Sequence, residues 1–112
     1  MNMIAELRET LPMEIRPASE GVEYLEAVIQ RKDLEQLMTV LAKHVGPAVK
    51  EPRGEAHFPT EIEGLVDSLG GLRLEQSFFY RREGDEKILY AALWPWVSNP
   101  EKITLKAGIG SI

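Results

Sequence analysis

Apolar residues are most concentrated between Gly71 and Trp96, in two runs with a polar interruption. Residues 72–80 and 88–96 are rich in aromatic, aliphatic and β-branched side chains, and a charged segment with Gly84-Asp85 separates them. Two such runs around a short polar segment predict a β-hairpin. Gly84-Asp85 suits a two-residue turn, in which the backbone needs positive φ angles.

That turn sets the expected register of the hairpin, because Arg81 then lies opposite Ile88. Side chains alternate between the two faces of a strand, so the register sorts the hairpin into two sets of residues. One face is core-like and holds Leu72, Leu74, Gln76, Phe78, Tyr80, Leu89, Ala91, Leu93 and Val97. The other mixes aromatic and charged residues and holds Arg73, Glu75, Ser77, Phe79, Arg81, Ile88, Tyr90, Ala92, Trp94 and Trp96.

The mixed face is expected to be covered. A sheet face left to solvent alternates cleanly between apolar and polar residues, and this face does not. The cover is either another segment of the chain or a second copy in a homodimer, or it is a small molecule or a different protein. A further alternative is partial exposure, because single apolar side chains are normal on protein surfaces.

Three segments carry apolar residues at helical spacing and predict helices. They are residues 1–10, which Pro12 ends, residues 34–45 and residues 60–69. The stripes expected to be buried are Leu34, Leu37, Met38, Leu41 and Val45 in the second segment, and Ile62, Leu65, Val66 and Leu69 in the third.

Two of these helices begin with the pattern of a capping box, in which side chains bond the free N–H groups of the first turn. Asp33 pairs with Gln36 in this way, and Thr60 pairs with Glu63. Gly64 lies inside the third helix, where glycine costs about 1 kcal/mol relative to alanine. Close packing of Gly64 against another backbone is therefore expected.

Two further segments are interpreted as strands. Residues 22–29 suit a helix or a strand, and their Val, Tyr and Ile content favours the strand. Residues 102–109 alternate strictly, with Ile103, Leu105, Ala107 and Ile109 inward, and the outward lysines suit an edge strand. A four-residue loop after Val97 would instead turn Ile103 and Leu105 toward the tryptophans. Pro95 cannot donate a ladder hydrogen bond, so a bulge or a free edge is expected around residues 94–96.

Together these elements predict an α+β two-layer sandwich. A mostly antiparallel sheet of three to four strands has two helices packed on one face. The chain has 112 residues, of which 44% are hydrophobic and 28% charged, a composition typical of one domain, residues 1–112, that buries its own core.

Composition excludes several kinds of chemistry. The absence of cysteine excludes disulfides, thiolate metal sites and cysteine nucleophiles. A net charge of −5 argues against nucleic acid as a partner. No apolar run approaches the roughly 18 residues that a membrane-spanning helix needs. The N-terminus lacks the pattern of a signal peptide, so the expected location is the cytoplasm.

His44 and His57 are the only histidines. His44 falls in the last turn of the second helix, where the helix dipole favours an imidazolium. A structural role at the border of the apolar stripe is favoured over metal or haem ligation, because a metal site needs three or four converging ligands. His57 lies in the loop before the third helix and has no ligand partner at a regular spacing.

Three functional hypotheses follow. The favoured one is a non-enzymatic binding or accessory protein that self-associates, or binds a protein partner, through Phe79, Tyr90, Trp94 and Trp96, since such aromatics dominate interface energies. The second is a small-ligand or haem carrier with a pocket near that face and His44 or His57 as a ligand. The third is an enzyme of unknown reaction with Arg73, Glu75 and His57 at its centre, and no catalytic motif supports it. No cofactor is predicted outside the haem alternative.

Overall fold

The computed structural model describes residues 2–17, 19, 24–46, 48, 50, 60–68 and 76–111, without the side chains of residues 60, 61, 68 and 111. The elements in chain order are α1 (Met3–Thr10), β1 (Glu14–Ile15), β2 (Tyr24–Gln30), the 3₁₀ turn η1 (Arg31–Asp33), α2 (Leu34–His44), α3 (Thr60–Ser68), β3 (Ser77–Arg82), β4 (Lys87–Pro95) and β5 (Lys102–Ser111).

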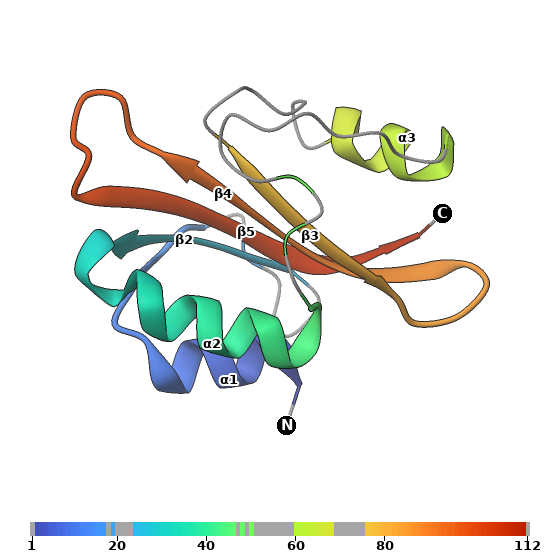
Figure 1. The fold of residues 1–112 in the computed structure, drawn as a ribbon, viewed down its shortest axis with the longest axis horizontal. Helices are drawn as coiled ribbons and strands as arrows, with labels where there is room; N and C mark the ends of the chain where they lie inside the picture. Colours follow the sequence, from blue (N-terminus) through green and yellow to red (C-terminus); the bar gives the residue numbers. More distant parts are fainter. Residues whose placement is uncertain are drawn as a thin grey trace.

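The strands form one five-stranded antiparallel sheet in the order β1-β2-β5-β4-β3 (Figure 1). This confirms the predicted α+β class and the strand interpretation of residues 24–29, which form β2 and join the sheet. The sheet has one strand more than expected because the short β1 pairs with β2. β5 is the central strand and not an edge, since β2 and β4 pair with its two sides.

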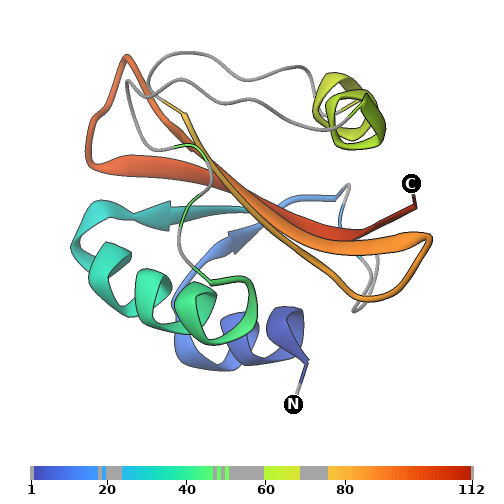
Figure 2. The same ribbon diagram turned by 45° about the vertical axis from the view of Figure 1, so that its right-hand side comes forward.

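Helices cover both faces of the sheet. α1 and α2 lie together on one face, here called the helix-pair face, and α3 lies on the opposite one, the α3 face (Figures 1 and 2). Two helices do pack on one face, but they are α1 and α2. The two main helices expected together there, residues 34–45 and 60–69, lie on opposite faces of the sheet. The core of the helix-pair face includes Met3, Ile4, Leu7, Leu25, Ile29, Leu37, Leu41, Phe79, Ala91 and Leu105.

The β3–β4 hairpin is shifted by one residue from the expected register. Arg81 lies opposite Leu89, and Arg82 lies opposite Ile88. The N–H of Glu83 donates to the Lys87 carbonyl at 2.9 Å, so residues 84–86 form the loop and not Gly84-Asp85 alone. A shift of one residue exchanges the two faces of a strand.

Phe79 is therefore part of the helix-pair core, and its predicted place on the aromatic face was wrong. Phe78 and Tyr80, which were expected on the core face, lie on the α3 face instead. Successive phenylalanines leave the register of β3 undetermined by patterning, and the observed pairing places each ring opposite a small residue, Ala92 for Phe78 and Ala91 for Phe79.

The assignment of β4 to its two faces was right over residues 88–94, but its end differs from expectation. Val97 was placed in the core row, yet it lies beyond the end of the strand and is fully exposed. No bulge interrupts the β4–β5 pairing, which runs through Pro95. The Trp96 N–H donates to the Lys102 carbonyl at 3.0 Å. Because N–H groups alternate along a strand, the nitrogen of Pro95 points away from β5.

β5 adopts the register that turns its apolar row toward α1 and α2. Leu105 lies opposite Leu93, and Ile103 lies opposite Pro95. Ile103, Leu105 and Ala107 are buried, whereas Ile109 is 42% exposed. The inward row is thus confirmed except at Ile109.

The stripe of α2 is centred differently from the predicted one. Leu37, Val40 and Leu41 are the buried residues of the helix, and Met38 is 38% exposed. The expected cap at Asp33 is absent because η1 runs directly into α2. Asp33 has φ −97° and ψ 4° and makes no side-chain capping bond, whereas an N-cap residue needs extended backbone.

α3 buries Ile62 and Val66 as predicted, while Leu69 and the side chain of Thr60, on which the expected cap depends, are not described. Gly64 does not pack against another backbone within the part of the chain that the structure describes. A Cβ atom built at Gly64 would meet nothing within 4 Å. The expectation of close packing there was wrong, because Gly64 lies on the exposed side of the helix.

Candidate functional site

The three aromatic residues predicted on β4 and just beyond it lie on the α3 face. Tyr90 is buried and stacks on Phe78, with ring centroids 6.4 Å apart and an interplanar angle of 20°. Trp94 and Trp96 are half-buried. Arg73, Glu75 and His57, the remaining candidates for this face, lie outside the described residues.

Lysine side chains of the central strand lie over the two indole rings. Lys106 Nζ is 4.9 Å from the ring centroid of Trp94, and Lys102 Nζ is 5.2 Å from that of Trp96. Both distances are typical of cation–π pairs, each worth about 0.5–1 kcal/mol at exposed sites.

Thr104 completes this surface between the two lysines. The indole Nε1–H of Trp96 donates to Thr104 Oγ1 at 2.8 Å, which fixes the ring against β5. Here Trp94, Trp96, Lys102, Thr104 and Lys106 are called the tryptophan–lysine strip. Every member is half-buried, so each keeps surface for contact with another molecule.

Sequence patterning did not identify the β5 half of this strip. Lys102, Thr104 and Lys106 were placed on the outward side of residues 102–109, but that strand was expected at an edge and its register was open. The alternation of these polar residues with apolar ones was the available signal. It locates them beside the tryptophans only once β5 is known to pair with β4.

A carboxylate borders the strip on the β2 side. Glu26 lies directly opposite Lys106 in the pairing of β2 with β5, and its Oε1 accepts a hydrogen bond of 2.9 Å from the Tyr24 hydroxyl. Burial and that hydrogen bond raise the pKa of Tyr24 far above its ordinary value, and burial raises the pKa of Tyr90. Both phenols therefore stay neutral at physiological pH, and that of Tyr24 acts as a hydrogen-bond donor to Glu26.

α3 covers only one end of this face. Ile62 and Val66 pack with Phe78 and Ile88 near the C-terminal end of β5, and a Cβ atom built at Gly110 would lie 3.0 Å from Leu65 Cδ1. A glycine at this position lets the helix side chains approach the strand. The strip lies at the other end of β4 and β5, beside the turn that joins them (Figure 1).

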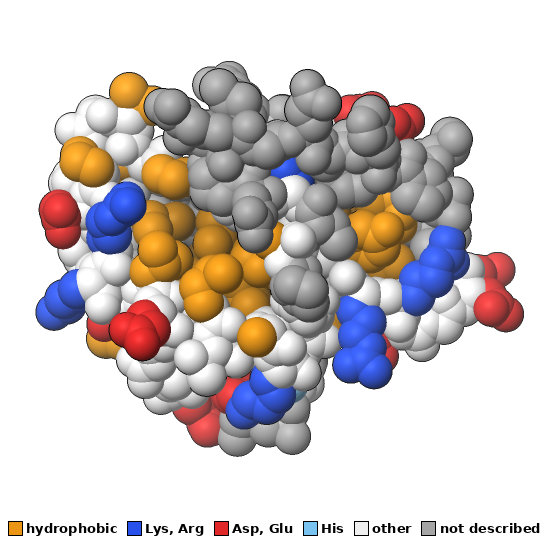
Figure 3. Space-filling model, viewed as in Figure 1, with side chains coloured by type: hydrophobic (Ala, Val, Ile, Leu, Met, Phe, Trp, Pro, Cys, Tyr) orange, Lys and Arg blue, Asp and Glu red, His pale blue; other side chains and the backbone are white. Residues whose placement is uncertain are grey.

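The surface near that turn carries apolar side chains. In the view of Figure 3, hydrophobic atoms gather on the left half of the molecule, the side of the β4–β5 turn, with single charged side chains between them. Flat aromatic rings, ammonium groups and a hydroxyl bind by stacking, ion pairing and hydrogen bonding.

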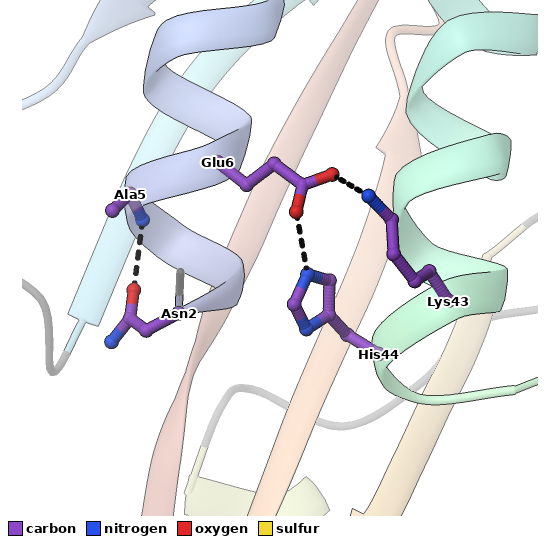
Figure 4. A network of polar contacts seen from close by, with 5 residues as sticks. All are labelled: Asn2, Ala5, Glu6, Lys43 and His44. Atoms are coloured by element: carbon purple, nitrogen blue, oxygen red, sulfur yellow. Dashed lines mark hydrogen bonds and ion pairs between the residues drawn. The ribbon is translucent and has the colours of Figure 1, made fainter.

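His44 belongs to a different cluster, on the helix-pair side. Its Nε2 lies 3.0 Å from Glu6 Oε1, and Glu6 Oε2 also accepts a hydrogen bond from Lys43 Nζ (Figure 4). These contacts join α1 to α2. The hydrogen bond from Lys43 and, next, that from His44 hold the pKa of Glu6 below its ordinary value of 4.5. The position of His44 at the end of α2 supports its structural interpretation.

The pH dependence of stability should report this Glu6 contact. A carboxyl group with a lowered folded-state pKa stabilises the folded protein above its unfolded pKa, and this contribution is lost as the pH falls through the folded pKa. Glu6→Gln should therefore lower the free energy of unfolding at pH 7, and the deficit should shrink below a pH of about 4.5. Urea unfolding of both proteins between pH 3 and pH 7 measures it.

Glu9→Gln, at an exposed position of the same helix, is the control and should give a small difference at every pH. A Glu6→Gln deficit that stays constant down to pH 3 would contradict the contribution assigned to the Glu6 carboxylate.

Lys50 is a second residue that sequence patterning did not single out. It is 7% exposed, its backbone N–H and carbonyl bond to Phe78, and its Nζ donates to the Gln76 carbonyl at 2.6 Å. A lysine in a segment rich in small and charged residues gives no signal of burial. Its backbone forms an isolated antiparallel bridge with Phe78 at the outer edge of β3.

Comparisons with protein-family models, with curated proteins and with solved structures found no match for this chain. Among the described helices, none has both the length and the apolar character needed to cross a bilayer. Within the same residues, no group of three or more His, Asp or Glu side chains is placed to hold a metal ion. The geometry of the tryptophan–lysine strip therefore carries the functional argument.

Proposed function

We propose that this protein is a non-enzymatic binding or accessory protein that forms a homodimer through the α3 face of its sheet. The observation that carries the proposal is the tryptophan–lysine strip. Its two half-buried tryptophans lie on the α3 face, at the end of β4 and β5 opposite to the end on which α3 packs. Tryptophan is among the residues that contribute most to protein interfaces, particularly at their centres.

The rigidity of the strip favours an interface. The hydrogen bond to Thr104 and the lysines above the rings hold both indoles in place before any partner arrives. Side chains that are already ordered lose less conformational entropy on association. A partner that covers them also removes their remaining apolar surface from water.

The charges beside the strip favour a second copy as the partner. Lys106 and Glu26 are neighbours on adjacent strands, and a twofold axis brings the same surface of two copies together in opposite orientation. Such an axis near this pair sets Lys106 of each copy against Glu26 of the other. It also leaves the two α3 helices at opposite ends of the interface.

Charge reversal tests this arrangement. Light scattering over a concentration series gives the mass of the wild type, of Lys106→Glu, of Glu26→Lys, and of an equal mixture of the two variants. Each reversal alone places like charges together twice and should weaken dimerisation by at least about 100-fold. The mixture should restore a dimer, because opposite charges then meet at both positions.

Recovery in the mixture separates an interface from an effect inside one chain, which mixing does not repair. Lys32→Glu, at an exposed lysine of η1, is the matched control and should leave the dimer unchanged. A wild type that is monomeric up to millimolar concentration, or a dimer that neither reversal weakens, would overturn the proposal.

A further inference from the structure

A cavity of about 300 Å³ lies on the other side of the sheet, where the β3–β4 hairpin extends past the ends of α1 and α2. The start of α1, the end of α2 and the hairpin loop lie at the same end of the molecule (Figures 1 and 2). The cavity is lined by Asn2, Met3, His44, Glu83, Lys87, Leu89 and Ile109. Its volume is at the lower limit of small-molecule sites.

The lining combines an apolar part with charges of both signs. Met3, Leu89 and Ile109 supply aliphatic surface from α1, β4 and β5. Glu83 and Lys87 belong to the hairpin end and are joined through the backbone, N–H of Glu83 to carbonyl of Lys87. Among the described residues, neither side chain takes part in an ion pair.

The two helix ends add polar groups that are held in place. The Oδ1 atom of Asn2 accepts the N–H of Ala5 at 2.9 Å, so the amide nitrogen of Asn2 is not used by the helix cap. The contact of His44 Nε2 with Glu6 (Figure 4) leaves the second ring nitrogen without a hydrogen-bond partner in the described part of the chain.

We propose that this cavity binds a small zwitterion with an aliphatic side chain, of the chemical class of a free α-amino acid. Lys87 would pair with the carboxylate and Glu83 with the ammonium group. The side chain would lie on Met3, Leu89 and Ile109. A ligand of a single charge would satisfy one member of the Glu83–Lys87 couple only, whereas a zwitterion satisfies both.

The site is independent of the proposed dimer. Leu89 and Ile109 lie on the helix-pair side of their strands, and Trp94 and Trp96 lie on the α3 side. Binding in the cavity should therefore change neither the mass of the protein nor its tryptophan emission. Failure of one proposal does not affect the other.

Titration followed by ¹H–¹⁵N NMR tests the ligand class with three compounds of similar aliphatic shape. They are L-leucine, 4-methylpentanoate, which lacks the ammonium group, and 3-methylbutylamine, which lacks the carboxylate. L-leucine should shift the amide signals of residues around the cavity with a dissociation constant on the order of 1 mM. Each single-charge analogue should bind about 2- to 5-fold more weakly.

Two exposed substitutions assign the charged groups. Lys87→Gln and Glu83→Gln should each weaken L-leucine binding by about 2- to 5-fold, and the exposed Lys32→Gln and Glu35→Gln should leave it unchanged. Equal or tighter binding of either analogue, no shift at 20-fold the expected dissociation constant, or unchanged binding by both cavity variants would overturn the proposal.

Discussion

Replacing Phe79 by alanine is expected to lower the free energy of unfolding by about 3–5 kcal/mol. The ring is 1% exposed and belongs to the core between the sheet, α1 and α2. Its removal loses the transfer free energy of the ring and leaves a cavity, since the neighbouring side chains only partly fill the space. Urea denaturation at pH 7, followed by circular dichroism, measures the change.

Arg81→Ala is the matched control, because Arg81 lies on the same strand and is exposed. Its effect should stay within about 0.5 kcal/mol. A cost below about 1 kcal/mol for Phe79→Ala would indicate that the ring lies outside the core.

Leu41→Ala should cost about 2–5 kcal/mol, because Leu41 is 0% exposed at the contact of α2 with the sheet. Met38→Ala, three residues earlier, should cost less than about 1 kcal/mol, since that side chain is 38% exposed. Both proteins would be unfolded with urea under the same conditions. Equal losses from the two substitutions would contradict the position of the buried stripe on α2.

The existence and type of the elements could be predicted because they depend on local periodicity. Leu37 and Leu41 repeat at helical spacing, and residues 102–109 alternate as a strand does. Their mutual arrangement depends on information that periodicity lacks. The stripes of α2 and α3 each indicate a buried face, but an amphipathic stripe does not specify which side of a sheet it meets.

The register of β3 escaped prediction for a related reason. Where a strand has apolar residues on both faces, a shift of one position fits the hydrophobic pattern almost equally well. The length of the hairpin loop then decides the register. Phe78 and Phe79 are both buried in the structure, on opposite faces. For β4 the sequence did indicate which residues share a face, because one row of the strand is aliphatic and the other is rich in aromatic residues.

The β4 side of the tryptophan–lysine strip could be predicted, because Trp94 and Trp96 follow from alternation along one strand and its extension. Lys102 and Lys106 required the pairing of β5 with β4, which the loop after Val97 left open. The contact of Glu6 with His44 joins residues 38 positions apart. No local pattern carries such a contact, because it depends on how α1 and α2 pack.

The position of β5 has a consequence for how the chain acquires its structure during synthesis. β5 follows the other four strands in sequence, yet it is the strand that joins β1–β2 to β3–β4. Because the ribosome releases the earlier strands first, β2 and β4 each have one unpaired edge until β5, which pairs with both, has been synthesised. Pairing across such a separation is slow, and unpaired edges attract other chains. The time between release of β2 and release of β5 is thus when the nascent protein most depends on protection from aggregation.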